Sequence, residues 1–269
     1  KEGEIFNDII FKGGTLLSRN YLDYHRFSED LDFVYKDSSD IRKLTRNERE
    51  RKIKSFVDIF VPKLKKVADV LNLNFSTDRS DTKYCSILHG RTVYIFRIYY
   101  EANRHIKIEI NFIEKIIHSP KIVSIKTITD FFDSKELLFI LNLKFQNFKV
   151  MSYSINEIIL EKYRALLTRN HLMERDLFDL YLIPNSLNVK VEEVVEKIEY
   201  SSLIKKNLKE VISKKFELLK DNTFFDSQEK ISDLAIVNYN LEDFNNFKLK
   251  IKPILINICK MFIQKRDLL

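Results

Sequence analysis

The stretch Ser28-Glu29-Asp30-Leu31-Asp32-Phe33 follows the triplet Gly13-Gly14-Thr15 along the chain. Side chains alternate between the two faces of a β-strand, so we expect Asp30 and Asp32 on one face and the apolar residues beside them on the core face. Two carboxylates this close repel each other, and a divalent cation between them relieves the repulsion. The glycines allow backbone N–H groups to approach a phosphate. Metal together with phosphate indicates nucleotide chemistry.

The composition is that of a globular protein with one large or two modest domains. The chain has 269 residues, of which 45% are hydrophobic, and this is enough to bury a core. Glycine and proline are scarce, at 4 residues each, which disfavours an all-β protein rich in tight turns. The net charge of +7 favours phosphate-bearing partners such as nucleotides, tRNA or DNA, although a lysine-rich solvated surface explains it equally well.

The two cysteines, Cys85 and Cys259, are far apart in the sequence and have no neighbouring ligand pattern. We therefore expect no structural disulfide. No apolar run reaches the length of a membrane span, and no signal peptide is evident. These features predict a cytoplasmic protein without a membrane partner.

The first half of the chain mixes strand and helix patterns. Short apolar runs predict strands over residues 9–11 and 27–35, separated by a short helix over 15–21. Apolar residues recur at three and four over residues 41–71, which is typical of a helix, although Pro62 lies within this run. Residues 92–100 and 105–113 alternate as two strands and predict a hairpin.

Glu109 is a third carboxylate, in the middle of the second hairpin strand. Ile108 and Ile110 beside it share the core face, whereas Lys107 and Glu109 share the polar face. Alternation alone is explained most simply by a solvent-facing residue on a half-buried sheet.

The second half of the chain is helical in pattern. Ser154 and Glu157 form a capping box that starts a helix running to about residue 169. Lys162 falls within the apolar arc of this helix, and a buried lysine is costly unless it is paired or meets an anion. Asp176 and Asp179 then share one face of the next helix with Arg175.

Further helices are predicted over residues 189–200, 202–219, 227–238 and 247–264. Lysines are dense in this region, at Lys205, Lys206, Lys209, Lys214 and Lys215. The change from mixed to helical pattern predicts two domains, residues 1–150 and residues 151–269.

Four motifs together resemble the AbiEii/AbiGii family of nucleotidyltransferase toxins. They are Lys12-Gly13-Gly14-Thr15, Arg26-Phe27-Ser28-Glu29-Asp30-Leu31-Asp32-Phe33, Glu161-Lys162-Tyr163-Arg164-Ala165-Leu166 and Arg175-Asp176-Leu177-Phe178-Asp179-Leu180-Tyr181. Their order and spacing agree with the family over residues 9–183, although Tyr163 stands where a smaller or aliphatic residue is common. The resemblance is therefore specific in the first two thirds of the chain.

The resemblance implies an α+β, polymerase-β-like nucleotidyltransferase fold, with a mixed sheet flanked by helices and a helical C-terminal region. Residues 1–150 would be the nucleotidyltransferase core, and residues 151–269 would add Lys162 and Asp176 to the site. Family members are typically bacterial toxins of toxin–antitoxin, abortive-infection or phage-defence modules. Some transfer nucleotides from an NTP to tRNA ends, so NTP, an RNA or tRNA acceptor and a cognate antitoxin are the expected partners.

Roles for individual residues follow from the resemblance. Asp30 and Asp32 would hold Mg²⁺ or Mn²⁺, and Glu109 would complete a second metal site or orient the nucleophile. The NTP phosphates would be bound by Gly13, Gly14, Thr15 and Arg19.

The helical region would contribute to binding of both substrates. Lys162 would meet the triphosphate, which explains a lysine in an apolar arc, and Asp176 would support Lys162 or a metal. Asp176 is preferred to Asp179 for this role. The lysines of the helices would hold a polyanionic acceptor.

Two other functions are compatible with the sequence. The same fold can transfer a nucleotide to a protein hydroxyl or to a small molecule. A non-catalytic nucleic-acid-binding or partner-binding protein is the second alternative, but it gives no reason to keep two mutually repelling carboxylates and a lysine in an apolar arc.

Overall fold

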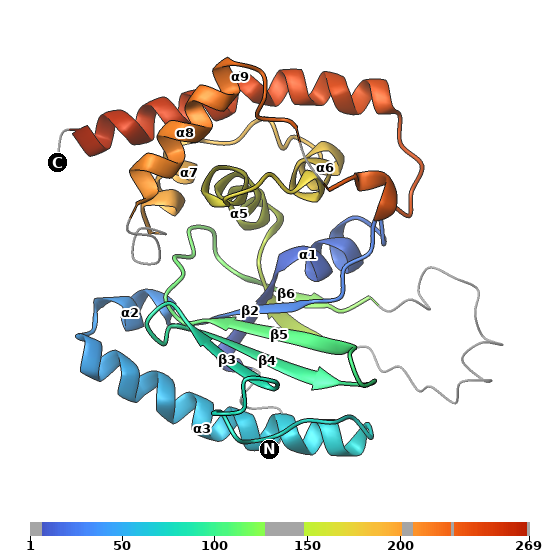
Figure 1. The fold of residues 1–269 in the computed structure, drawn as a ribbon, viewed down its shortest axis with the longest axis vertical. Coiled ribbons are helices and arrows are strands. Elements are labelled where there is room, and N and C mark those ends of the chain that lie inside the picture. The colour runs from blue at the N-terminus through green and yellow to red at the C-terminus, as the bar shows by residue number, and fades with distance from the viewer. Residues whose placement is uncertain (1–6, 127–147, 201–206, 227–228, 268–269) are drawn as a thin grey trace. The chain divides into compact units, whose positions relative to one another are not determined.

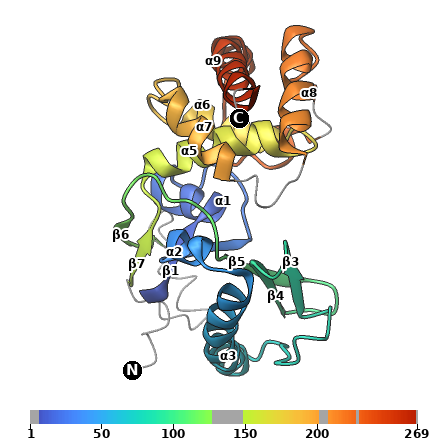
Figure 2. The ribbon, with the colours of Figure 1, turned by 90° about the vertical axis from the view of Figure 1, so that its left-hand side faces the viewer.

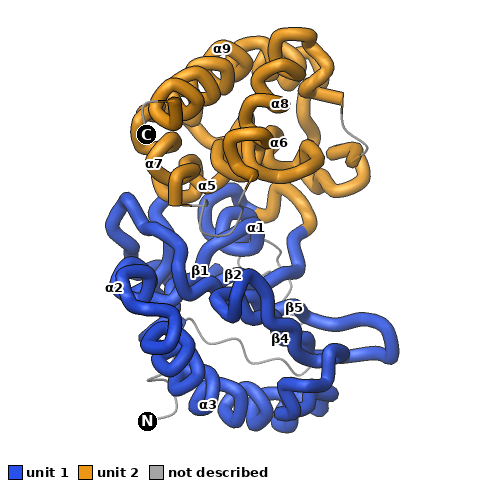
Figure 3. Tube along the Cα trace, turned by 60° about the vertical axis from the view of Figure 1, so that its left-hand side comes forward, with its two compact units in different colours: residues 1–23, 28–154 blue, residues 24–27, 155–269 orange. Residues whose placement is uncertain are grey.

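The computed structural model describes residues 7–126, 148–200, 207–226 and 229–267 (Figure 1). The chain divides into two compact units. The first unit comprises residues 1–23 and 28–154, and the second comprises residues 24–27 and 155–269 (Figure 3). Residues 24–27 therefore leave the first unit for the second, and the chain then returns to the first.

The first unit is built on a mixed sheet, which has seven strands in the described residues. Their order across the sheet is β3-β4-β5-β2-β1-β7-β6. Strand β2 pairs antiparallel with β1 and parallel with β5, and β1 pairs parallel with β7. The strands are β1 (Ile9–Lys12), β2 (Leu31–Tyr35), β3 (Cys85–Leu88), β4 (Val93–Tyr99), β5 (His105–Asn111), β6 (Lys121–Ser124) and β7 (Lys149–Ser152).

Helices lie on both faces of this sheet (Figures 1 and 2). On one face, α3 (Arg46–Val70) packs Phe56 against Tyr35 and Phe112. Thr45 and Glu48 cap the start of α3, and the helix continues through Pro62. On the other face, α1 (Gly13–Leu16) leads directly into a π-helix, Leu17–Tyr21. The short helix α2 (Ser38–Lys43) precedes α3.

The second unit is helical. Its elements are α5 (Ile155–Thr168), α6 (Glu174–Leu182), α7 (Val191–Tyr200), α8 (Leu208–Lys220), a 3-10 helix (Ile231–Asp233) and α9 (Leu241–Asp267). Aromatic rings of α6 and α9 form much of the core, where Phe178 and Phe244 meet edge to face with centroids 5.7 Å apart. Across the described parts of both units, every helix is too short or too polar to cross a membrane.

The acidic strand begins later than the sequence predicts. It starts at Leu31 rather than near Phe27, so Asp30 immediately precedes it. The reason is that Arg26 bridges Ala235 and the Phe27 N–H donates to the Leu234 carbonyl, both within the second unit. Backbone groups used in this way cannot also join the sheet.

The last third of the chain also differs from the sequence pattern. The helix predicted over residues 227–238 is wrong: the described part holds only the 3-10 helix, and Ala235 pairs with Arg26. The helix predicted over residues 202–219 is described from Leu208, and Lys205 and Lys206 lie outside the described residues. Lys215 is buried rather than solvated.

The predicted fold class is confirmed. A mixed sheet carries helices on both faces, and the C-terminal region is helical. The predicted hairpin forms between β4 and β5, with Tyr99 opposite His105.

Candidate active site

Asp32 lies in the middle of a polar row that crosses three strands of the first unit. In the register of the sheet, Asp32 is beside Lys12 of β1 and beside Glu109 of β5. Register partners on adjacent strands project from the same face. The sheet therefore brings together two carboxylates that are far apart in the sequence, and it places a lysine on the other side of Asp32.

Gly13 makes room for the Asp32 carboxylate. Its φ is +81°, a conformation that favours glycine. A Cβ atom at this position would lie 2.9 Å from Asp32 Cβ and closer still to Asp32 Oδ2. The missing side chain therefore serves first to let a carboxylate rest against the backbone.

Thr15 holds the backbone of Asp30 in place. The buried hydroxyl of Thr15 donates to the Asp30 carbonyl over 2.5 Å and lies 3.0 Å from Ser28 Oγ. This arrangement ties the start of β2 to α1 and leaves the Asp30 side chain half exposed. Thr15 thus positions Asp30 through its hydroxyl.

Lys107 supplies a cation to the acidic cluster, which consists of Asp30, Asp32 and Glu109. Its Nζ lies 2.8 Å from Asp30 Oδ2 and 3.8 Å from Glu109 Oε2. Burial alone would lower the pKa of Lys107, but the bond to Asp30 and the nearby carboxylates raise it. Lys107 is therefore charged and paired in this structure.

The pKa of Asp32 is raised above its usual value. Burial is the largest cause, and the nearby carboxylates of Glu109 and Asp30 add to it, while Lys12 and Lys107 oppose it. Burial and the neighbouring carboxylates therefore disfavour the charged form of Asp32, and a cation close to this carboxylate would offset that cost.

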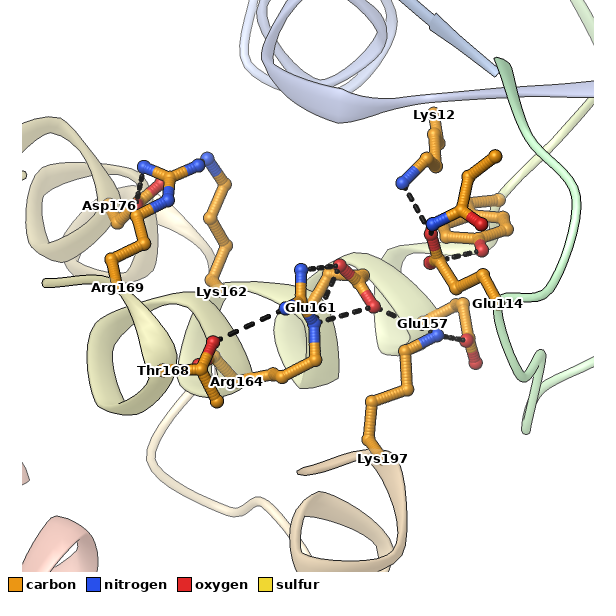
Figure 4. A network of polar contacts seen from close by, with 12 residues as sticks. Lys12, Glu114, Glu157, Glu161, Lys162, Arg164, Thr168, Arg169, Asp176 and Lys197 are labelled. Atoms are coloured by element: carbon orange, nitrogen blue, oxygen red, sulfur yellow. Dashed lines mark hydrogen bonds and ion pairs between the residues drawn. The ribbon is translucent and has the colours of Figure 1, made fainter. Parts of the chain in front are cut away.

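Lys12 is fixed by a network behind Asp32. Its Nζ donates to Glu114 Oε2 over 2.5 Å, and the Tyr153 hydroxyl donates to Glu114 Oε1 over 2.6 Å (Figure 4). Asn111 also donates to Glu114, over 3.3 Å. The buried lysine is thereby held in place next to Asp32.

The donor set fits a hard divalent cation. Asp30, Asp32 and Glu109 offer only carboxylate oxygens, which Mg²⁺ and Mn²⁺ prefer. Lys107 already places one positive charge among them. Within the described residues, no group of three or more histidine, cysteine, aspartate or glutamate side chains is arranged as a metal site.

The second unit contains a buried ionic cluster centred on Asp179 of α6. Arg26 donates to both carboxylate oxygens, over 2.6 and 2.7 Å, and His25 Nε2 lies 2.7 Å from Oδ1. Lys162 Nζ of α5 lies 2.5 Å from Oδ2. Burial alone would raise the pKa of Asp179, but the charges of Lys162 and Arg26 and the hydrogen bonds from Arg26 and His25 hold it well below its usual value.

Lys162 is shared between two carboxylates. Its Nζ lies 2.8 Å from Asp176 Oδ1 and 2.5 Å from Asp179 Oδ2. Arg169 donates to the other oxygen of Asp176 over 2.6 Å (Figure 4). Lys162 is buried, as its place in the apolar arc predicts. Asp179 is the more central partner because it also binds Arg26 and His25.

The family of this chain is decided by its sequence. A family model described as "Nucleotidyl transferase AbiEii toxin, Type IV TA system" matches residues 2–250. The chain belongs to the AbiEii family. It is therefore a nucleotidyltransferase toxin of a type IV toxin–antitoxin system, with an NTP substrate and an antitoxin partner. The resemblance seen over residues 9–183 is confirmed and extends over most of the chain.

A solved structure is similar to this AbiEii protein. It is MenT4, a nucleotidyltransferase toxin from Mycobacterium tuberculosis H37Rv, with 14% sequence identity and a TM-score of 0.48. The match covers 94% of this chain and 76% of that chain. No curated protein sequence matches this AbiEii chain.

The residues predicted for the AbiEii site fall into two groups. The first unit holds Asp30, Asp32, Glu109, Gly13, Gly14, Thr15 and Arg19, and the second holds Lys162 and Asp176. Arg19 lies in the π-helix, one turn after Thr15, and is half-buried. The roles assigned to these residues remain predictions.

Sequence reasoning missed three charged residues around the acidic cluster. Lys12 was visible in the first motif, and Lys107 precedes Glu109 by two positions on the same polar face, so spacing alone could have suggested both. Glu114 gave no local signal, because its role depends on the approach of Lys12 and Tyr153, which are distant in the sequence.

Proposed function

We propose that this AbiEii toxin transfers an NMP from an NTP to a hydroxyl of RNA, with tRNA as the best candidate acceptor, in a reaction that depends on Mg²⁺ or Mn²⁺. The observation that carries this proposal is that Asp32 and Glu109 lie side by side on neighbouring strands of one sheet, with Asp30 immediately before the strand of Asp32. The transfer itself is the activity of the family.

The acidic cluster is assigned to the metal. When bound, a divalent ion supplies positive charge to the phosphate oxygens and lowers the energy of the transition state. Asp30, Asp32 and Glu109 would hold it, Gly13 would keep the Asp32 carboxylate against the backbone, and Lys12 would limit the negative charge at Asp32.

The triphosphate is assigned to cationic and N–H groups. Gly13 and Gly14 lie at the start of a helical segment, where backbone N–H groups are open to an anion. Thr15 follows them and positions Asp30. Arg19 would add a positive charge one turn later. Lys162, supported by Asp176, would contact the triphosphate as well.

The proposed reaction is a single displacement. The acceptor oxygen forms a new bond to the α-phosphorus, and the bond from that phosphorus to the oxygen bridging to the β-phosphate breaks. Pyrophosphate leaves, and the hydroxyl proton passes to a carboxylate of the acidic cluster.

An RNA acceptor is supported by charge. The chain has a net charge of +7. In the described part of the second unit, Lys214 and Lys250 are exposed on α8 and α9 and are available to phosphates. Such contacts predict acceptor binding that weakens steeply with salt. A polyanionic acceptor also suits a toxin, and we extend the proposal to a role in phage defence.

The test is a labelling experiment. The protein is incubated with Mg²⁺, total bacterial RNA and each α-labelled NTP in turn. We expect label in a tRNA-sized band for one NTP, and its loss with Asp30→Asn or with chelator.

Asp40→Asn is the matched control, because Asp40 is an exposed aspartate of α2 paired only weakly with Lys43, over 3.0 Å. Label on protein would replace the RNA acceptor by a protein acceptor. Label that survives both Asp30→Asn and chelator would overturn the metal site.

A further inference from the structure

Lys107 lies on the same strand as Glu109, and its ammonium lies among the carboxylates of the acidic cluster. Its ammonium lies 2.8 Å from Asp30 and 3.8 Å from Glu109, two of the three carboxylates assigned to the metal. The side chains of Lys107 and Glu109 are both 28% exposed, and that of Asp30 is 50% exposed. The site is therefore reached from solvent, but it already contains a cation.

Lys107 and a divalent ion compete for the same oxygens. An ammonium within bonding distance of Asp30 repels a metal ion placed on that carboxylate, because both are positive and close together. The backbone of Lys107 cannot move aside, since β5 pairs with β4 on one side and with β2 on the other. Its four-carbon side chain can swing away, however.

A triphosphate offers Lys107 another partner. Its oxygens carry several negative charges, and a lysine binds phosphate as a mobile point charge. Transfer of the ammonium from Asp30 to a phosphate oxygen would leave the carboxylates open to the metal without leaving Lys107 unpaired.

We propose that Lys107 is an internal counter-ion that competes with the divalent cation for Asp30 and Glu109, so that the cation binds tightly only with the nucleotide. This inference rests on the metal-dependent function proposed above. It gives the toxin a site that stays closed to metal until an NTP arrives. Metal and nucleotide binding are then coupled, each strengthening the other by the same factor.

The test measures metal binding rather than activity. Mn²⁺ is titrated into the full chain and free Mn²⁺ is followed by electron paramagnetic resonance, with and without each of the four α,β-methylene NTP analogues. For wild type we expect the effective analogue to tighten Mn²⁺ binding about tenfold, within the usual range of coupling between ligands. Lys107→Met should bind Mn²⁺ alone about tenfold more tightly than wild type and should respond little to the analogue.

Lys36→Met is the matched control. Lys36 is also in the first unit, and its Nζ lies 2.5 Å from Asp8, outside the acidic cluster. This variant removes the same charge and should bind Mn²⁺ as wild type does. Lys107→Gln provides a second neutral variant, and thermal melts show that each protein is folded.

The outcomes separate the inference from the function on which it rests. Equal or weaker Mn²⁺ binding by folded Lys107→Met and Lys107→Gln, in a wild type that binds Mn²⁺ with nucleotide, overturns the role of Lys107 alone. The same gain in Lys36→Met would reduce the effect to net charge and also overturn it. Absence of Mn²⁺ binding by wild type with every analogue overturns the metal-dependent function and the inference together.

Discussion

The Asp32 side chain packs against Gly13, in the space that a Cβ atom of residue 13 would need. The glycine of the first motif and the aspartate of the second are thus two parts of one packing arrangement. The antiparallel pairing of β1 with β2 brings the two motifs together, because it sets Lys12 opposite Asp32.

Gly13→Ala is expected to destabilise the protein and to weaken Mn²⁺ binding. An alanine with positive φ costs roughly 1–2 kcal/mol, and the clash with Asp32 adds roughly 1–3 kcal/mol. Urea unfolding and Mn²⁺ titration measure the two effects.

Gly90→Ala isolates the cost of the backbone conformation. Gly90 also has a positive φ, of +64°, but a Cβ there would meet nothing within 4 Å. Equal losses of stability in the two variants, with unchanged Mn²⁺ binding, would show that the contact with Asp32 is unimportant.

Asp32→Asn is expected to stabilise the fold at pH 7.5 in chelator while abolishing transfer. The pKa of Asp32 is raised in the folded state, so its protonated form is favoured there. The stability that this group contributes is present below the pKa of the unfolded chain and is lost as pH rises through the folded pKa. Asp32→Asn cannot ionise, so the variant avoids this loss of folding stability at neutral pH.

Thermal melts and the labelling assay test this pair of effects. Asp40→Asn, which removes an exposed aspartate, should change neither. Full transfer by Asp32→Asn would show that the acidic cluster is not the catalytic metal site.

Lys162→Met is expected to weaken NTP binding about tenfold or more, since a charge-assisted hydrogen bond contributes about 1.5–3 kcal/mol. It should also destabilise the second unit, because Asp176 and Asp179 each lose a buried cation. Calorimetric titration with NTP and urea unfolding measure the two losses separately.

Lys197→Met is a closely matched control. Lys197 of α7 is buried and is likewise shared by two carboxylates, Glu157 and Glu161, the second of which also binds Arg164 (Figure 4). It should lose stability like Lys162→Met but keep its NTP affinity. Equal NTP affinity in both variants would make the role of Lys162 purely structural.

Asp179→Asn is expected to destabilise the protein by roughly 3–5 kcal/mol at pH 7, because Arg26 and Lys162 lose a buried counter-ion. The pKa of Asp179 is lowered in the folded state. Its contribution is therefore complete above the ordinary aspartate pKa of about 4 and is lost as pH falls through the folded pKa.

Urea unfolding of wild type and variant from pH 7 to pH 3 tests this prediction. The difference in unfolding free energy should be constant at the upper end and should shrink at the lower end. A difference that grows as the pH falls would contradict the assigned direction of the pKa shift.

The sequence by itself determined the features that depend on local periodicity and on motifs. Alternation placed Glu109 on the polar face of its strand, and helical spacing placed Lys162 among buried residues, because both properties depend only on which face a side chain occupies. The motifs identified the family, and with it the chemistry.

The tertiary structure decided which charged groups meet. Lys107 reaches Asp30 only because β5 lies beside β2 in one register, and Asp179 gains His25 and Arg26 from 154 and 153 positions away in the chain. A one-residue change of register would reverse the faces and break such contacts without altering the local pattern. Faces are set by neighbours in the sequence, whereas partners are set by strand register and by the path of residues 24–27 into the second unit.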